Sequence, residues 1–179
     1  DGFLLFKQLL RRDCASLLWN RVYSVQFSIR GKRPRHQEHG QYYVDESLIF
    51  TRLIYLHNFD PDRAPQDGWP LLVEVTEPAE CPVAVPEELI RRVRLDLDRI
   101  GVLPEGNQIV DKHVLVIDPA YVVFTSESQT VMQRARSFLE DHNVIPLGRY
   151  GRWEYSSMSG VLKDGFDWAE AFSARQYSE

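Results

Sequence analysis

Apolar residues follow a period of two in one part of the chain, which predicts a strand. From residue 21 onward they alternate with a second, more polar set: Tyr23, Val25, Phe27 and Ile29 against Val22, Ser24, Gln26 and Ser28. Successive side chains of a strand point to opposite faces of a sheet, so this alternation indicates a half-buried strand. Three more β regions are expected, at residues 42–56 (two short strands around Asp45-Glu46-Ser47), 71–75 and 109–117.

Helical patterns are expected in four segments. Residues 3–18 carry apolar side chains on most faces and predict a buried helix. Pro86 at a first turn, followed by two glutamates, opens a second helix, and Gly101 ends it. The apolar face of this second helix consists of Leu89, Val93, Leu97 and Ile100.

Two more helices are expected near the C-terminus. Ser126 and Gln129 have the spacing of a capping box, in which two residues exchange hydrogen bonds at a helix start. The helix after them carries Val131, Ala135, Phe138, Leu139 and His142. The last helix is expected to start at residues 157–159 and to bury Leu162, Phe166, Ala169 and Phe172.

The order of these elements predicts the fold class. The strands come in runs and do not alternate strictly with helices, which favours an α+β domain with a mixed or largely antiparallel sheet and flanking helices. Residues 58–70 are rich in Pro, Asp and Gly and predict a loop. At 179 residues, the chain is long enough for one domain or for a part of a larger one.

The charge balance and the motifs exclude several function classes. A formal net charge of −5 argues against general nucleic-acid binding, which needs positive charge facing the phosphates. The basic run Lys32-Arg33-Pro34-Arg35 can contact nucleic acid or an acidic partner, although the overall charge favours a solvated hairpin end. The segment 36–39 lacks the histidine spacing of a zinc protease, so no metal is expected. No serine-hydrolase elbow or phosphate loop occurs either.

Cysteine usage and hydropathy bear on location. Cys14 and Cys81 have no metal-ligand spacing, and two such thiols are typical of buried cysteines in a reducing compartment. The apolar runs are far shorter than the roughly 18 residues needed to cross a bilayer. We therefore expect a cytoplasmic protein with no membrane partner. The chain starts at Asp1 directly in a helix-like pattern, which suggests that a preceding segment was removed or lies elsewhere.

The segment of residues 148–158 carries the strongest chemical signal. It reads Gly148-Arg149-Tyr150-Gly151-Arg152-Trp153-Glu154-Tyr155-Ser156-Ser157-Met158 and leads into the predicted last helix. Arginine offers a rigid fork of donors to phosphate oxygens, and glycine lets the backbone approach a ligand closely. The free N–H groups of a helix start attract anions. The segment therefore suits a phosphorylated or otherwise anionic ligand.

This segment resembles the C-terminal flavin-closing motif of the FAD-dependent amine oxidoreductases and UDP-galactopyranose mutase-like flavoproteins. That motif reads G-R-x-G-x-(aromatic)-x-Y-x-x-M before the last helix, and every fixed position is matched. The sequence departs from the family at Ser157 and Ser159, where acidic residues are frequent.

The resemblance covers most of the chain from about residue 22. Residues 50–59, which contain Thr51-Arg52, are similar to a family strand that follows a short acidic turn. Residues 72–75 are similar to the strand beside it, with Glu74 as its glutamate. Asp118-Pro119-Ala120-Tyr121 is similar to the segment that supplies a substrate-facing tyrosine in the mutases, with Val122 at the usual proline position.

The resemblance implies two sets of site residues and names no catalytic residue. The implied substrate-binding residues are Arg52, Tyr121, Arg149 and Tyr155. The implied cofactor-binding residues are Gly148, Gly151, Ser157 and Met158, the last through its backbone N–H.

Structural alternatives stay open for each of these residues. Arg52 and Glu74 can form a simple cross-strand ion pair. The two tyrosines can be core aromatics, and Met158 can be a packing residue.

The resemblance also implies that a large part of the flavoprotein is missing. Family members bind the FAD pyrophosphate with an N-terminal Gly-x-Gly-x-x-Gly unit, and the ten glycines here do not reproduce it. We therefore interpret residues 1–179 as a single substrate-domain-like unit with a closing segment at about 146–173, lacking the Rossmann half. FAD binding requires that half, in cis or in trans.

The function implied is that of the C-terminal portion of an FAD-dependent oxidoreductase or mutase-like enzyme. This portion would orient an anionic small molecule. The likeness to the mutases alone implies a nucleotide sugar as that molecule. The alternative is a non-catalytic ligand-binding or partner-binding module that has lost the cofactor half. An uncovered apolar face is expected at the first helix, Tyr150 and Trp153, either exposed or buried by self-association.

Overall fold

The computed structural model describes residues 16–35 and 37–176, which belong to two compact units. One unit consists of residues 20–120, and the other of residues 1–19 together with 121–179. The predicted first helix at residues 3–18 lies outside the described residues except at its end, where Leu18 begins a strand instead. The interpretation of residues 1–179 as one substrate-domain-like unit stays a prediction.

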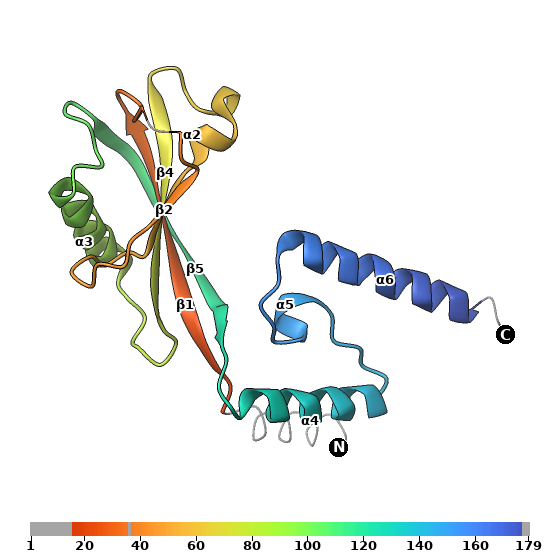
Figure 1. Cartoon of the computed structure of the whole chain (residues 1–179). Helices are drawn as coiled ribbons and strands as arrows, with labels where there is room; N and C mark the ends of the chain where they lie inside the picture. The colour runs from red at the N-terminus through yellow and green to blue at the C-terminus, as the bar shows by residue number, and fades with distance from the viewer. Residues whose placement is uncertain (1–15, 36, 177–179) are drawn as a thin grey trace. The chain divides into compact units, whose positions relative to one another are not determined.

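A five-stranded sheet is the main element of the unit formed by residues 20–120 (Figure 1). Its strands are β1 (Leu18–Arg30), β2 (Gly40–Tyr42), β3 (Arg52–Tyr55), β4 (Gly68–Pro78) and β5 (Gln108–Val123). They lie in the order β2-β3-β4-β1-β5, and the pairs β1–β4, β2–β3 and β3–β4 are antiparallel. The predicted α+β class with a largely antiparallel sheet is confirmed.

The hydrophobic core lies between the sheet and helix α3 (Pro86–Arg99), as the period of two in β1 predicts (Figure 1). In the β1–β4 register, the core pairs are Tyr23 with Val75, Val25 with Val73, Phe27 with Leu71, and Ile29 with Trp69. The helix contributes Leu89, Val93 and Leu97, all buried as predicted. Full burial of each large apolar side chain contributes about 1.5–3 kcal/mol, so this layer stabilises the whole sheet unit.

Several strand limits differ from the predicted ones. The region 42–56 contains only β3 in full, because β2 lies at residues 40–42 and merely reaches its first residue. Residues 43–51 are irregular, and Leu56 begins the short helix α2 (Leu56–Phe59). The predicted loop 58–70 includes the end of α2 and the 3₁₀ turn η1 (Pro61–Arg63). β4 extends beyond the predicted 71–75 because its antiparallel pairing with β1 continues where the apolar alternation has faded. β5 extends beyond the predicted 109–117 at both ends.

The basic turn after β1 is fixed by two side chains. Asn107 accepts a hydrogen bond from the Lys32 N–H (2.9 Å) and donates one to the Lys32 carbonyl (2.9 Å). Arg33 donates to the carbonyl oxygens of Ala64, Pro65 and Gly68 at 3.2, 2.7 and 3.0 Å. Arg33 therefore holds a loop of its own unit, which gives it a structural role.

Arg21 of β1 is buried, with only 5% of its surface exposed, and its guanidinium contacts β4, β5 and the turn after β4. Its Nε donates to Asp118 of β5 and its Nη1 to Glu77 of β4, both at 2.9 Å. It also donates to the backbone carbonyls of Ala79 (2.9 Å) and Cys81 (3.1 Å) after β4. The hydrogen bond to Asp118 is the main cause that raises the pKa of Arg21 above its usual value.

The second unit contains helices α4 (Ser128–Asp141), α5 (Gly148–Gly151) and α6 (Met158–Gln176). The predicted capping box of Ser126 and Gln129 is wrong by one residue. Instead, Thr125 Oγ1 accepts from the Ser128 N–H and Ser128 Oγ accepts from the Thr125 N–H, both at 3.1 Å. The side chain of Ser128 is shorter than that of the expected glutamine, but its Oγ still accepts a hydrogen bond from the Thr125 backbone N–H.

The predicted burial along α6 is wrong. Leu162, Phe166 and Phe172 are 64%, 73% and 46% exposed, and Ala169 is exposed as well. The residues have the spacing of an amphipathic helix, but no described element covers this face, so the pattern alone did not ensure burial. No helix in the described part of the chain is long and apolar enough to cross a membrane.

We expect Gly31→Ala to destabilise the protein more than Gly101→Ala. Both glycines have positive φ, +133° and +69°, and an alanine in the left-handed region costs about 1–2 kcal/mol. At Gly31 an added Cβ would also lie 2.2 Å from Asn107 Oδ1, whereas at Gly101 nothing lies within 4 Å. Urea unfolding monitored by circular dichroism measures the difference; equal losses would show that the Asn107 contact relaxes freely.

Replacing Arg21 by glutamine is expected to lower the urea midpoint clearly. The change removes the donors of two carboxylates and two carbonyls while leaving those acceptors partly buried. Arg91→Gln is the control, because Arg91 pairs with Glu88 on an exposed helix surface, where ion pairs contribute little. Similar midpoints for both variants would contradict the role given to Arg21.

Candidate functional site

The segment that precedes α6 is folded back on itself by short-range hydrogen bonds. The Arg152 N–H donates to the Gly148 carbonyl and the Glu154 N–H to the Arg149 carbonyl, both at 2.9 Å. Gly148 has φ +70° and is buried, and a Cβ there would lie 3.2 Å from Val161 Cγ1 of α6. A glycine at 148 is thus required by backbone conformation and by packing against α6.

Arg149 lies against two tyrosine rings. Its guanidinium carbon is 5.2 Å from the ring centre of Tyr121 and 4.8 Å from that of Tyr155. The rings themselves are stacked, with centres 6.5 Å apart and planes 24° apart. Such cation–π contacts hold a guanidinium in place without using its N–H donors. Three of the four implied substrate-binding residues are therefore brought together.

The N–H groups of Arg149 are only partly used. Nη1 donates to the Ser156 carbonyl at 3.3 Å, a long hydrogen bond. Nε and Nη2 are buried and have no hydrogen-bond partner within the described residues. No carboxylate in this part of the chain pairs with Arg149 either. Because buried donors are normally satisfied, these two atoms suggest an acceptor that comes from outside the described chain.

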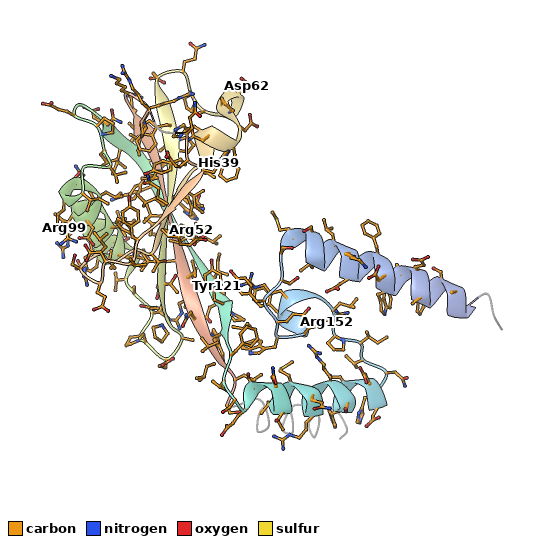
Figure 2. All side chains as sticks on the ribbon, viewed as in Figure 1. His39, Arg52, Asp62, Arg99, Tyr121 and Arg152 are labelled. Carbon is orange, nitrogen blue, oxygen red and sulfur yellow. The ribbon has the colours of Figure 1, made fainter. Side chains whose placement is uncertain are left out.

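The second arginine of the segment has a different environment. Arg152 pairs with Asp164 of α6 at 3.2 Å and approaches Glu154 at 3.9 Å (its position after α5 is labelled in Figure 2). Arg136 of α4 approaches Glu154 at 3.8 Å and donates to the Arg152 carbonyl at 2.7 Å. Arg152 is neutralised within its own unit, so it joins α4, the segment and α6 as a structural residue.

Two of the implied cofactor-binding residues, Ser157 and Met158, lie at the start of α6. Ser157 Oγ accepts a hydrogen bond from the Gly160 N–H at 3.1 Å, which is the geometry of a helix N-cap. Met158 is the first residue of α6, and its side chain is 87% exposed. The fourth, Gly151, ends α5, where a Cβ would lie 3.5 Å from the Pro146 carbonyl carbon. Their predicted contacts to a cofactor stay predictions.

Sequence reasoning did not single out Trp153 as a site residue. Trp153 has φ +51°, which bulky residues rarely adopt, and its buried Nε1 has no acceptor among the described residues. Its ring meets Trp19 edge to face at 5.8 Å. A strained backbone and an unsatisfied donor often occur at functional sites.

Arg52 belongs to the sheet unit, whereas Tyr121, Arg149 and Tyr155 belong to the other (Arg52 and Tyr121 are labelled in Figure 2). It pairs with Glu74 on β4 at 2.9 Å and donates to Tyr42 Oη at 2.7 Å. Tyr42 on β2, Arg52 on β3 and Glu74 on β4 lie opposite one another in the observed register. The cross-strand ion pair considered for Arg52 is therefore present, with side chains 27% and 15% exposed.

The arrangement in the second unit suits an anion more than acid–base chemistry. Two adjacent guanidinium N–H groups match two oxygens of a phosphate or carboxylate, and tyrosine rings stack on a planar group. The described residues contain no group of three or more His, Cys, Asp or Glu side chains that could hold a metal ion.

The solved structures that resemble this chain include two that are described as enzymes. One is a reduced UDP-galactopyranose mutase, with a TM-score of 0.72 and 20% identity over 80% of this chain. The other, provisionally described as a protoporphyrinogen oxidase of Exiguobacterium sp. 255-15, has a TM-score of 0.72 and 13% identity over 96% of this chain. This chain has the fold of a part of these proteins. It covers only 31% and 39% of their lengths.

Sequence comparisons add nothing to this result: no protein-family model and no curated protein sequence matches the chain. The fold expected from the C-terminal motif is thus confirmed by structure alone. At these identities the likeness concerns the fold, and it assigns no activity.

Proposed function

We propose that this chain is the substrate-domain and flavin-closing portion of an FAD-dependent oxidoreductase or a UDP-galactopyranose mutase-like enzyme. The fold likeness to a mutase and to an oxidase-like protein supports the class. The motif of residues 148–158 supports the placement of the ligand. In this proposal the chain binds and orients the substrate, and the flavin supplies the electron or covalent chemistry.

The unsatisfied Arg149 guanidinium is the observation that carries the proposal. Two tyrosine rings hold it, and two of its buried donors lack an acceptor in the described chain. Burying an arginine in this way costs free energy unless an anion meets it. A phosphate or carboxylate of the substrate would complete the site. Arg52, whose charge is balanced by Glu74 within the sheet unit, is proposed as a substrate-binding residue on the resemblance alone.

The residues present fit one anionic group but not a whole dinucleotide. The chain has no Gly-x-Gly-x-x-Gly segment for a pyrophosphate, and three of the four implied cofactor-binding residues shape the backbone around α5 and α6. FAD would therefore be held mainly by a separate flavin-binding domain. We propose that domain, in cis or in trans, as the partner of this chain. We also propose that the protein is cytoplasmic.

The exposed face of α6 supports such a partner. Its apolar residues recur at helical spacing on one face: Met158, Val161, Leu162, Phe166, Trp168, Ala169 and Phe172. A stripe of this width on a globular protein normally packs against a neighbouring element. We propose that the flavin-binding domain covers it.

In a full-length protein that contains this chain, Arg149→Ala is expected to weaken an anionic ligand by about 2 kcal/mol or more, because a desolvated charge pair is lost. This loss equals roughly a 30-fold change in affinity. Isothermal titration with UDP as the probe measures it. Arg152→Ala is the control, since Asp164 already neutralises Arg152. Equal and small effects would favour an Arg149 that only packs on its tyrosines.

The 179-residue chain is expected to purify colourless. The remaining flavin contacts are too few to offset the loss of translational and rotational freedom on binding. A visible absorption spectrum of the purified chain, before and after addition of FAD, measures this. A yellow protein with bound flavin would contradict the need for a separate domain.

A non-catalytic binding module is the alternative, and the encoding gene distinguishes the two. A Gly-x-Gly-x-x-Gly βαβ unit encoded directly upstream, or in an adjacent partner gene, supports the enzyme. A nearby start codon with no such partner supports the module.

A further inference from the structure

Strand β5 is an edge of the sheet and exposes apolar side chains there. Among the described strands, β5 has β1 as its only neighbour. Val110, Leu115, Val116 and Ile117 are 51%, 48%, 44% and 37% exposed. Natural sheets usually protect such edges by short strands, charges or prolines. The opposite edge, β2, is only three residues long, so it follows this rule whereas the centre of β5 does not.

The sequence of β5 is complementary to itself around Leu115. When two copies run antiparallel with Leu115 opposite Leu115, Val114 lies opposite Val116 and Lys112 lies opposite Asp118. By symmetry each of the last two pairs occurs twice. Directly opposite side chains on one face of a sheet interact, and both apolar and opposite-charge pairs are favourable.

The two ends of this register also agree with the chemistry. Asp111 would lie opposite Pro119, which has no N–H to donate, so the ladder would end there. Lys112 is exposed, and the Asp118 carboxylate is 35% exposed beside Arg21. Lys112 of a second copy would thus extend the ion-pair network of Arg21. The other charge-matched register, with Asp111 opposite Lys112, would leave Val116 opposite the Asn107 loop and Ile117 uncovered.

We propose that two copies of this chain associate by antiparallel pairing of β5 about Leu115, which makes one sheet continuous through both. The interface is self-complementary, as a two-fold dimer requires. Backbone hydrogen bonds between the two β5 strands would satisfy the edge, and the Leu115 pair and the two Val114–Val116 pairs would cover part of its exposed apolar surface. This association uses the sheet unit alone and does not depend on a flavin or on Arg149.

Sedimentation velocity of the 179-residue chain over a range of concentrations tests the proposal. We expect a concentration-dependent dimer that Leu115→Lys abolishes, because the two-fold axis places both lysines opposite each other. Val110→Lys is the matched control: it adds the same charge at an equally exposed position of β5, beyond the end of the proposed ladder. It should leave the dimer intact. A monomer at every concentration, or a dimer that persists in Leu115→Lys, would overturn the proposal.

Cysteine cross-linking tests the register even if Leu115→Lys fails to fold. In a background with Cys14 and Cys81 changed to serine, mild oxidation should link Leu115→Cys into a covalent dimer, since only a residue on the axis opposes itself. Val110→Cys, which lies far from its own copy in this register, should stay monomeric on a denaturing gel. Equal cross-linking of the two variants, or efficient linking through Val110→Cys alone, would refute pairing about Leu115.

Discussion

The sheet unit depends on the buried guanidinium of Arg21. Five donors in a fixed plane reach β4, β5 and the turn after β4 at once, so each acceptor fixes the position of the others. A lysine would supply one point charge and could not span these directions. The buried charge is tolerated because carboxylates and carbonyls replace the water it loses. Arg21 thereby joins β1, β4, β5 and the turn after β4.

Arg149 is also a partly buried arginine, but its guanidinium is held by aromatic rings and not by carboxylates. The proposed function is based on this difference. Arg21 and Arg152 have carboxylates within their own units, whereas Arg149 has two aromatic faces and donors left over. Aromatic faces position a cation while keeping its hydrogen-bonding capacity available. A protein that needed only to pack an arginine would pair it as it pairs Arg152. The proposed ligand site therefore rests on Arg149, whose environment differs from that of the other two arginines.

Much of the fold could be predicted from the sequence because it follows from short-range periodicity. The alternation in β1 and the apolar stripe of α3 correspond to the two sides of one core, and the class and the strand regions were predicted on that basis. The limits of β4 were missed because its pairing partner β1, which lies far along the chain, extends it. The exposure of α6 was missed because periodicity reports an amphipathic face but not the presence of a neighbour to cover it.

The site was predictable in its residue types and less so in their roles. The clustering of Tyr121 with Arg149 and Tyr155 spans residues far apart in sequence, and only the resemblance placed Tyr121 near the motif. The Ser157 cap was accessible from spacing, since its hydroxyl lies three residues before the Gly160 N–H. Trp153 was not, because a left-handed backbone at a tryptophan has no sequence signature.

The left-handed Gly148 beneath Val161 has a consequence for how such motifs evolve. A larger residue there would strain the backbone and crowd the Val161 side chain of α6 whether or not any ligand is bound. Selection for folding alone can thus preserve the glycine, and the same holds for the serine that caps α6. A descendant that had lost its redox chemistry would still display most of the pattern. An arginine that lies between two tyrosines and has no carboxylate partner would distinguish a protein that still binds its ligand from one that has lost ligand binding.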